Sequence, residues 1–144
     1  MIKYIDHWNE DVGIYVCRIK LNTKNLDLCG VGVAECHPND LKYKSQFTGG
    51  FIAENRAKID LIKQLNKTSI KPSILTLKHV IGTMQHSKNY NPDSYEAKRI
   101  QKELDNLINE YNDNIKTIEE LKDLIKNYIE EKDKYHKKLD NGQI

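Results

Sequence analysis

The sequence predicts an α+β fold, in which a small N-terminal antiparallel β-sheet is followed by helices and ends in a long, coiled-coil-like helix. Three observations predict it. Short β-branched and aromatic runs fill the first 40 residues, a helical period follows from residue 48, and an unbroken heptad pattern begins after residue 91. At 144 residues the chain is expected to form a single domain, with a sheet region at 1–47, two helices at 48–90 and a long helix at 91–140.

The sheet is predicted from a hairpin with a long loop, whose strands are residues 13–21 and 26–34. In the second strand Gly30 and Gly32 alternate with valines, so one face of the strand is bare. A bare face lets a helix or another backbone approach closely, and a β-bulge is an equal interpretation. Residues 3–5 are expected to add a third strand, because a two-stranded ribbon is marginal alone.

Two helices are predicted in the middle of the chain. The first covers about 50–66, with Thr48, Gly49 and Gly50 offering a cap. The second begins after Thr68 and Ser69, whose hydroxyls can cap it, and ends near Ser87.

The last segment carries an a/d heptad seam over six heptads, at alternating steps of three and four residues. Its members are Ala97, Ile100, Leu104, Leu107, Tyr111, Asn114, Ile118, Leu121, Ile125, Tyr128, Lys132, Tyr135 and Leu139. A partner must cover this seam. A break at 112–116 would give an intramolecular hairpin, whereas the phase that survives across Asn114 favours one helix that pairs between chains. We expect a homo-oligomer, either a dimer or a multiple of dimers.

Composition and charge exclude several classes of protein. Mean hydropathy is −0.72, and no apolar run approaches the roughly 18 residues of a membrane span, so no membrane partner is expected. The start of the chain lacks the apolar core of a signal peptide, and three cysteines are an odd number for a disulfide framework. We expect reduced thiols and a cytoplasmic protein.

Charge is unevenly distributed along the chain. Residues 42–91 carry nine basic against two acidic residues, whereas residues 92–144 carry 10 basic against 13 acidic. The basic segment attracts anions, and the acidic tail would repel a duplex. A small phosphorylated ligand is therefore expected rather than duplex DNA.

Signatures of catalysis and of metal binding are missing. The spacing from Cys29 to Cys36 and His37 matches no compact zinc pattern, so no metal site is expected. Cys36 and His37 are neighbours on a strand end and point to opposite faces, which disfavours a nucleophilic pair. The glycines at 49 and 50 lack the flanking residues of a phosphate loop. No cofactor is expected.

Three arginines stand among twenty lysines, which makes each a candidate for anion binding. Arg56 falls near the apolar side of the first helix, where an ion pair with Glu35, Asp40 or Glu96 and phosphate binding are equally favoured. Arg99 either pairs with Glu103 or binds phosphate.

Residues 87–95 form the loop that best suits a binding site. The loop combines a helix N-terminus with asparagines, tyrosines and Lys88, and its alternative interpretation is a capped turn with aromatic anchors.

Three motif regions carry a resemblance to a known family. Residues 32–40 (Gly-Val-Ala-Glu-Cys-His-Pro-Asn-Asp) and 48–57, which include Thr48-Gly49 and Ile52-Ala53-Glu54-Asn55-Arg56-Ala57, are followed by residues 87–96. Over about residues 12–100 the layout resembles the first described family of phage anti-Thoeris sponges. The resemblance implies an N-terminal sheet, long C-terminal helices, a homo-oligomer and no catalysis, in the cytoplasm of the infected bacterial host.

The resemblance also implies a ligand. Members of that family bind cyclic ADP-ribose isomers, including glycocyclic ones, and keep them from the defence effector; some also bind cyclic di- or trinucleotides at a separate site. Carried over to this chain, Arg56 and Arg99 would hold phosphates and Asn91 would read adenine. An aromatic residue expected within 81–84 is missing, so Tyr90, Tyr95 or Phe51 must replace it. The candidate ligand-binding residues are Phe51, Arg56, Lys88, Tyr90, Asn91, Tyr95 and Arg99.

Two other functions stay open. A coiled-coil inhibitor would dock its tail helix on a host defence enzyme. A hydrolase that cleaves a cyclic nucleotide would use His37 and Asp40.

Overall fold

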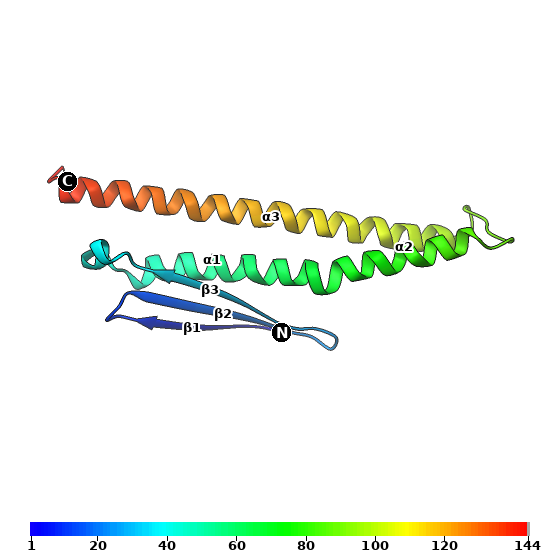
Figure 1. The fold of residues 1–144 in the computed structure, drawn as a ribbon, viewed down its shortest axis with the longest axis horizontal. Coiled ribbons are helices and arrows are strands. Elements are labelled where there is room, and N and C mark those ends of the chain that lie inside the picture. Colours follow the sequence, from blue (N-terminus) through cyan, green and yellow to red (C-terminus); the bar gives the residue numbers. More distant parts are fainter. Residues whose placement is uncertain (144) are drawn as a thin grey trace. The chain divides into compact units, whose positions relative to one another are not determined.

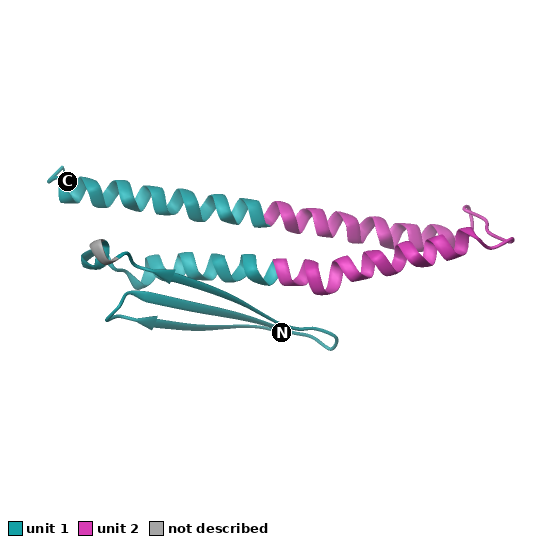
Figure 2. Ribbon diagram, viewed as in Figure 1, with its two compact units in different colours: residues 1–62, 118–144 teal, residues 63–117 magenta. Residues whose placement is uncertain are grey.

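The computed structural model describes residues 1–143, apart from the side chains of Pro38 and Asn39, and it has the predicted α+β class (Figure 1). The strands are β1 (Ile2–Asn9), β2 (Ile14–Asn22) and β3 (Asp27–Glu35), followed by a short 3-10 helix, η1 (Pro38–Tyr43). The helices are α1 (Gln46–Leu65), a π-helical turn η2 (Asn66–Ile70), α2 (Lys71–Gln85) and α3 (Tyr95–Asp140). The chain divides into two compact units, one formed by Met1–Ile62 with Ile118–Ile144 and the other by Lys63–Thr117 (Figure 2).

The sheet of the first unit is an antiparallel meander in the order β1-β2-β3. Tyr15, Cys17 and Ile19 are buried on the face that packs against Ala53 and Ala57 of α1. The bare face predicted for β3 is confirmed as the place where this helix approaches. A Cβ on Gly32 would lie 1.9 Å from the Ala53 carbonyl oxygen, and one on Gly30 would lie 2.3 Å from that of Ala57.

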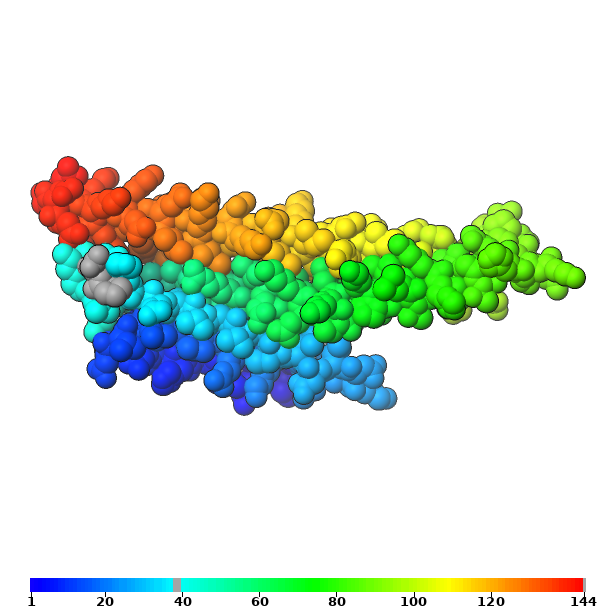
Figure 3. Space-filling model, in the orientation of Figure 1, coloured from blue at the N-terminus to red at the C-terminus, as the bar shows by residue number. Residues whose placement is uncertain are grey.

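The opposite side of α1 packs against α3, so that in this unit α1 lies between the sheet and the C-terminal half of α3 (Figure 3). Ile59 forms a buried cluster with Ile118 and Ile125. Ile52 and Ile62 add to the cluster from α1, and Leu121 and Ile129 add to it from α3.

The second unit has its own core, in which η2 and α2 pack against the first half of α3. Ile70 and Ile74 are buried with Leu104. The buried Asn66 donates from its amide nitrogen to the Tyr111 carbonyl at 3.2 Å and accepts from the Asn114 amide at 2.8 Å. Asn114, one of the two polar residues of the predicted seam, therefore has a partner in the same chain.

The continuous helix that the heptad phase favours is confirmed, because α3 is one helix from Tyr95 to Asp140, without the alternative break at 112–116. Within each unit the buried seam residues of α3 pack against helices of the same chain. The heptad pattern thus identified the buried face of α3. A helix seam has the same period whichever helix covers it, so the pattern alone does not identify the covering helix.

Two predicted helix starts are wrong. The first long helix begins at Gln46, where the Ser45 hydroxyl accepts the Thr48 backbone N–H at 3.2 Å. Thr68 and Ser69 cap nothing, since they lie inside the π turn, and Thr68 donates its hydroxyl to the Gln64 carbonyl at 2.7 Å. The extra residue of a π turn lets the chain stay helical up to Pro72, which lacks an N–H for the helix ladder.

Candidate functional site

The main candidate site is a cavity of about 370 Å³ in the unit that contains the sheet. It lies where the end of β3, η1 and the start of α1 meet residues 129–136 of α3. Its volume falls within the roughly 300–1,000 Å³ typical of small-molecule sites. Residues from the first two motif regions line it together: Ala34, Glu35, Cys36, His37, Asp40, Thr48, Gly49, Ile52 and Arg56.

Arg56 is exposed at this cavity and caps the free edge of β3. Its Nη1 donates to the Val33 carbonyl oxygen at 2.8 Å. One turn later in α1, the Asp60 carboxylate accepts the Val31 backbone N–H at 2.8 Å. These two side chains occupy backbone groups that an edge strand otherwise offers to other strands. The buried ion pair considered for Arg56 is thus replaced by a carbonyl contact, and one such bond does not saturate the five N–H groups of a guanidinium.

Three aromatic side chains from separate elements line the same cavity: Trp8 from β1, Tyr43 from η1 and His136 from α3. Tyr43 and His136 are stacked, with ring centroids 4.3 Å apart and an angle of 15° between their planes. Flat rings of this kind provide faces on which a base can stack.

Tyr43 is hydrogen-bonded to the end of α3. Its hydroxyl donates to Asp140 at 2.6 Å, and Lys42 lies 2.7 Å from the same carboxylate oxygen. The hydrogen bond to Asp140 raises the pKa of Tyr43, and the hydrogen bond from Lys42 lowers the pKa of Asp140. These groups are on the surface, so the contact orients the Tyr43 ring more than it stabilises the fold.

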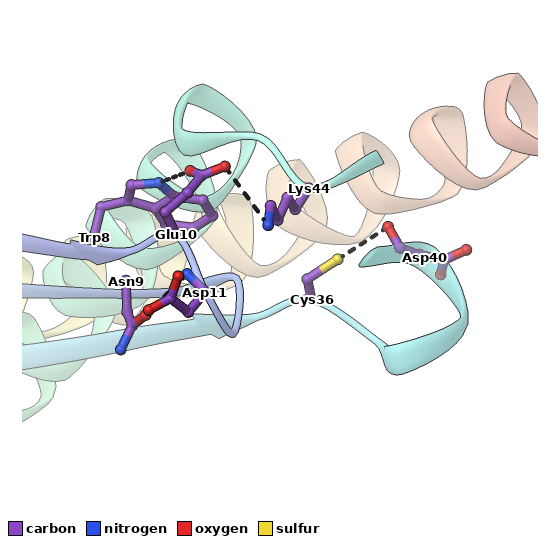
Figure 4. Close-up of polar contacts among 7 residues, drawn as sticks. All are labelled: Trp8, Asn9, Glu10, Asp11, Cys36, Asp40 and Lys44. Atoms are coloured by element: carbon purple, nitrogen blue, oxygen red, sulfur yellow. Dashed lines mark hydrogen bonds and ion pairs between the residues drawn. The ribbon is translucent and has the colours of Figure 1, made fainter. Parts of the chain in front are cut away.

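Figure 4 shows polar contacts of four residues that line the cavity, Trp8, Cys36, Asp40 and Lys44. The Glu10 carboxylate accepts the Trp8 indole N–H and lies 3.7 Å from the Lys44 ammonium. The Cys36 thiol donates to the Asp40 carbonyl at 3.3 Å. Burial raises the pKa of Cys36, with the Asp40 charge adding to it. The thiol is therefore held protonated, which suits a structural role better than a nucleophilic one.

Both signs of charge line the wall. Lys44, Arg56 and Lys132 contribute three cations, and Glu35, Asp40 and Asp133 contribute three carboxylates. Cations bind phosphate through charge-assisted hydrogen bonds, and carboxylates accept the hydroxyls of ribose. A mixed wall suits a ligand that carries both groups.

Five of the seven predicted ligand-binding residues belong to the other unit. Lys88, Asn91, Tyr95 and Arg99 are exposed and Tyr90 is half-buried. The Asn91 side-chain oxygen accepts the Asp93 backbone N–H at 3.0 Å. The Ser94 hydroxyl accepts the Ala97 backbone N–H at 3.2 Å, at the start of α3.

This geometry is a capped turn, the alternative interpretation of residues 87–95. Tyr90 lines a separate cavity of about 340 Å³ in the same unit, together with Lys98 and Lys102.

The side chain of Phe51, the remaining predicted residue, packs against another aromatic ring. Its ring stacks on Tyr128 with centroids 4.3 Å apart, and it lines a different hollow, beside Tyr15 and Glu54. Arg56 is therefore the one residue of the predicted set that lines the main cavity.

Sequence reasoning missed several residues of this cavity: Trp8, Tyr43, Lys44, Lys132 and His136. The chain offered one signal for them. Lys132 is a polar residue of the seam, as Asn114 is, and His136 lies one turn beyond Lys132 on α3. The others come from elements far apart in the sequence, and no local pattern connects them.

In the part of the chain that the structure describes, no group of three or more His, Cys, Asp or Glu side chains is placed to hold a metal ion. Among those same residues, no helix combines the length and apolarity that a membrane span requires. Comparison with protein-family models, with curated proteins and with solved structures finds no match.

Proposed function

We propose that the protein is a phage anti-defence protein that binds a cyclic nucleotide immune signal and holds it intact. The proposed ligands are cyclic ADP-ribose isomers, including glycocyclic ones, with cyclic di- or trinucleotides as further candidates, in the cytoplasm of the infected host. One observation carries the proposal. The first two motif regions on which the family resemblance rests line a single cavity with Arg56.

The chemistry of that cavity matches the parts of such a ligand. Arg56, Lys44 and Lys132 can neutralise a diphosphate. Asp40 or Asp133 can accept ribose hydroxyls, and the aromatic rings can stack on adenine. Sequestration needs tight binding and the exclusion of water, and no general base.

Hydrolysis is the second candidate function, because His37 and Asp40, the pair expected of a hydrolase, both line the same cavity. The coiled-coil inhibitor receives less support. Such an inhibitor needs a free seam on its tail helix, whereas the buried seam residues of α3 pack within the chain.

Calorimetric titration of the full chain with cyclic ADP-ribose isomers tests the site. Arg56→Gln keeps a donor for the Val33 carbonyl but removes the charge, so the strand edge stays capped. We expect this variant to bind about 10- to 100-fold more weakly. Arg99→Gln is the matched control, with affinity unchanged. If Arg99→Gln loses binding while Arg56→Gln keeps it, the ligand site belongs to the other unit.

Release of the bound nucleotide by heating separates sequestration from hydrolysis. After incubation the protein is denatured, and the released nucleotide is identified by mass spectrometry. Intact ligand in amounts equal to that bound supports sequestration. Fragments that disappear in His37→Ala and Asp40→Asn support hydrolysis.

A further inference from the structure

One wall of the main cavity is held in place differently from the others. β3, α1 and α3 carry side chains of the buried clusters, whereas η1 contributes Asp40 and Tyr43 to the cavity without such an anchor. None of the described side chains of η1 belongs to a buried cluster, and Leu41 is 38% exposed. A segment with few buried apolar contacts opens at a low cost in free energy.

The ends of η1 are tied to the sheet side of the cavity. The Cys36 thiol donates to the Asp40 carbonyl at 3.3 Å, and Lys44 lies 3.7 Å from Glu10 of the β1–β2 turn (Figure 4). At six residues, η1 is also longer than most 3-10 helices, which seldom exceed three or four. Its own hydrogen bonds therefore hold it weakly.

The opposite side of η1 meets the last two turns of α3. The described hydrogen bonds, ion pairs and ring contacts between these elements all come from Lys42 and Tyr43. Both side chains contact the same oxygen of Asp140, at 2.7 and 2.6 Å. The Tyr43 ring stacks on His136, one turn before Asp140.

Asp140 does not serve the helix that carries it. It is the last residue of α3, where the negative end of the helix dipole disfavours a carboxylate. Its partners are on η1 instead, and Asp140 itself is not among the residues that line the cavity. The contact that it makes therefore joins two walls of the cavity.

We propose that η1 is a strap across the ligand cavity, and that Asp140 is the positioning residue that holds the strap closed. The inference rests on the proposed function, because it assigns the route by which the ligand enters and leaves the same cavity. When the contacts with Lys42 and Tyr43 break, η1 lifts away from α3. When they form again, the Tyr43 ring returns to His136 and the cavity closes.

The strength of these contacts suits a segment that opens often. The side chains of Lys42 and Asp140 are 61% and 43% exposed, so solvent screens their attraction. Exposed contacts of this kind each favour the closed state by only about two- to fivefold. The strap is then closed most of the time and still opens on the timescale of binding.

Hydrogen exchange of the full chain without ligand tests the strap directly. The reporters are the Asp40 and Lys44 amides, which bond to the His37 and Leu41 carbonyls. Asp140→Ala removes the acceptor of both contacts, so exchange of these amides should accelerate by about three- to tenfold. Alanine is the better helix former, so α3 itself should keep its protection.

Two further variants complete the exchange experiment. Glu131→Ala, which removes another exposed carboxylate of α3, is the matched control and should leave the strap unchanged. Tyr43→Phe loses the hydroxyl but keeps the ring on His136, so a smaller acceleration is expected. Unchanged exchange of η1 in both Asp140→Ala and Tyr43→Phe would overturn the proposal.

Rates of ligand binding test the gating role. Trp8 is the only tryptophan of the chain and lines the cavity, so its fluorescence reports binding of a cyclic ADP-ribose isomer in stopped flow. Asp140→Ala should accelerate association and release by a similar factor. Affinity should change by less than about threefold, because the same contacts close the free and the bound protein.

Weaker affinity with an unchanged association rate would overturn the gating role, because Asp140 would then only orient the Tyr43 ring. If no isomer binds to the wild type, the proposed function fails. The exchange experiment needs no ligand, so it still decides whether η1 is a strap held by Asp140.

Discussion

At the scale of single residues, two glycines on β3, which have no side chain, set the distance between the sheet and α1. Gly30 and Gly32 on β3 face Ala53 and Ala57 on α1, and the backbones approach until no Cβ fits at either glycine. This close approach brings Arg56 and Asp60 within hydrogen-bonding distance of the strand edge. The position of the candidate ligand-binding arginine therefore depends on two glycines.

Gly32→Ala should destabilise the protein by about 2–3 kcal/mol or more, because the added Cβ meets backbone atoms that cannot rotate away. Gly82→Ala is the matched control. Nothing lies within 4 Å of its added Cβ, and in a helix this change should stabilise by about 0.5–1 kcal/mol. Urea denaturation measures both. Equal stability of the two variants would contradict the packing described here.

Cys17 should resist alkylation in the folded protein. It is fully buried beneath α1, and burial, reinforced by Asp6, raises the pKa of its thiol to about 12. At pH 8 the thiolate is then scarce as well as inaccessible. Mass spectrometry after iodoacetamide treatment should find Cys29 and Cys36 modified before Cys17. Modification of Cys17 at the same rate in folded and in denatured protein would show that this core is not closed.

Glu54→Gln should stabilise the protein near neutral pH. Burial and the neighbouring Asp6 raise the pKa of Glu54 above its ordinary value of 4.5. A raised folded pKa favours the protonated form, so its stabilising contribution is complete below pH 4.5 and is lost as pH rises through the folded pKa.

Glutamine mimics the protonated side chain at every pH. The melting temperature of Glu54→Gln should exceed that of the wild type by about 1–3 °C at pH 7, with little difference at pH 4. A larger gain in melting temperature at pH 4 than at pH 7 would contradict a raised pKa of Glu54 in the folded protein.

At the scale of elements, α1, η2 and α2 follow one another without a loop between them, and the π turn carries a buried polar contact. Asn66, in that turn, is paired with Asn114 of α3 at 2.8 Å. A lone amide among apolar side chains is costly unless it is satisfied, so this pair fixes the alignment of the two helices.

Asn114→Ala should cost about 1–3 kcal/mol, because it removes the donor to the buried Asn66 oxygen. Replacing both asparagines with leucine removes the unsatisfied group and should recover much of that loss. Denaturant unfolding of the single and double variants measures the coupling. Additive losses would show that the two amides do not depend on each other.

Much of the fold could be predicted from the sequence, for local reasons. Alternation in 13–21 and 26–34 predicted the hairpin, and the spacing of Gly30 and Gly32 predicted the close approach of the helix. The heptad phase predicted the buried face of α3 but not what covers it, since that depends on contacts between distant segments. A helix start was predicted from Thr68, Ser69 and Pro72. A π turn that accommodates a proline has no sequence pattern of its own, so the sequence could not predict that the helix continues.

The candidate site was less predictable. The scarcity of arginine singled out Arg56, and the structure places it at the main cavity. A binding site was predicted at residues 87–95 from residue types that also form a capped turn. Hydrogen bonds to the Asn91 and Ser94 side chains show that turn. Tyr43 and His136 meet only in three dimensions, so the sequence could not associate them.

At the scale of the whole molecule, each of the two units has its own buried core. The unit that contains the sheet carries the cavity lined by the first two motif regions, with cations, carboxylates and rings in its wall. The other unit carries the 87–95 loop, whose candidate residues are mostly exposed. Binding of the proposed ligand should therefore change the first unit more than the second.

Hydrogen exchange of the full chain with and without a bound cyclic ADP-ribose isomer tests this claim most directly. Protection is expected in residues 34–56 and 129–136, with the amides of 87–99 unchanged. Protection confined to 87–99, or no change anywhere under saturating ligand, would contradict the assignment of the cavity as the binding site.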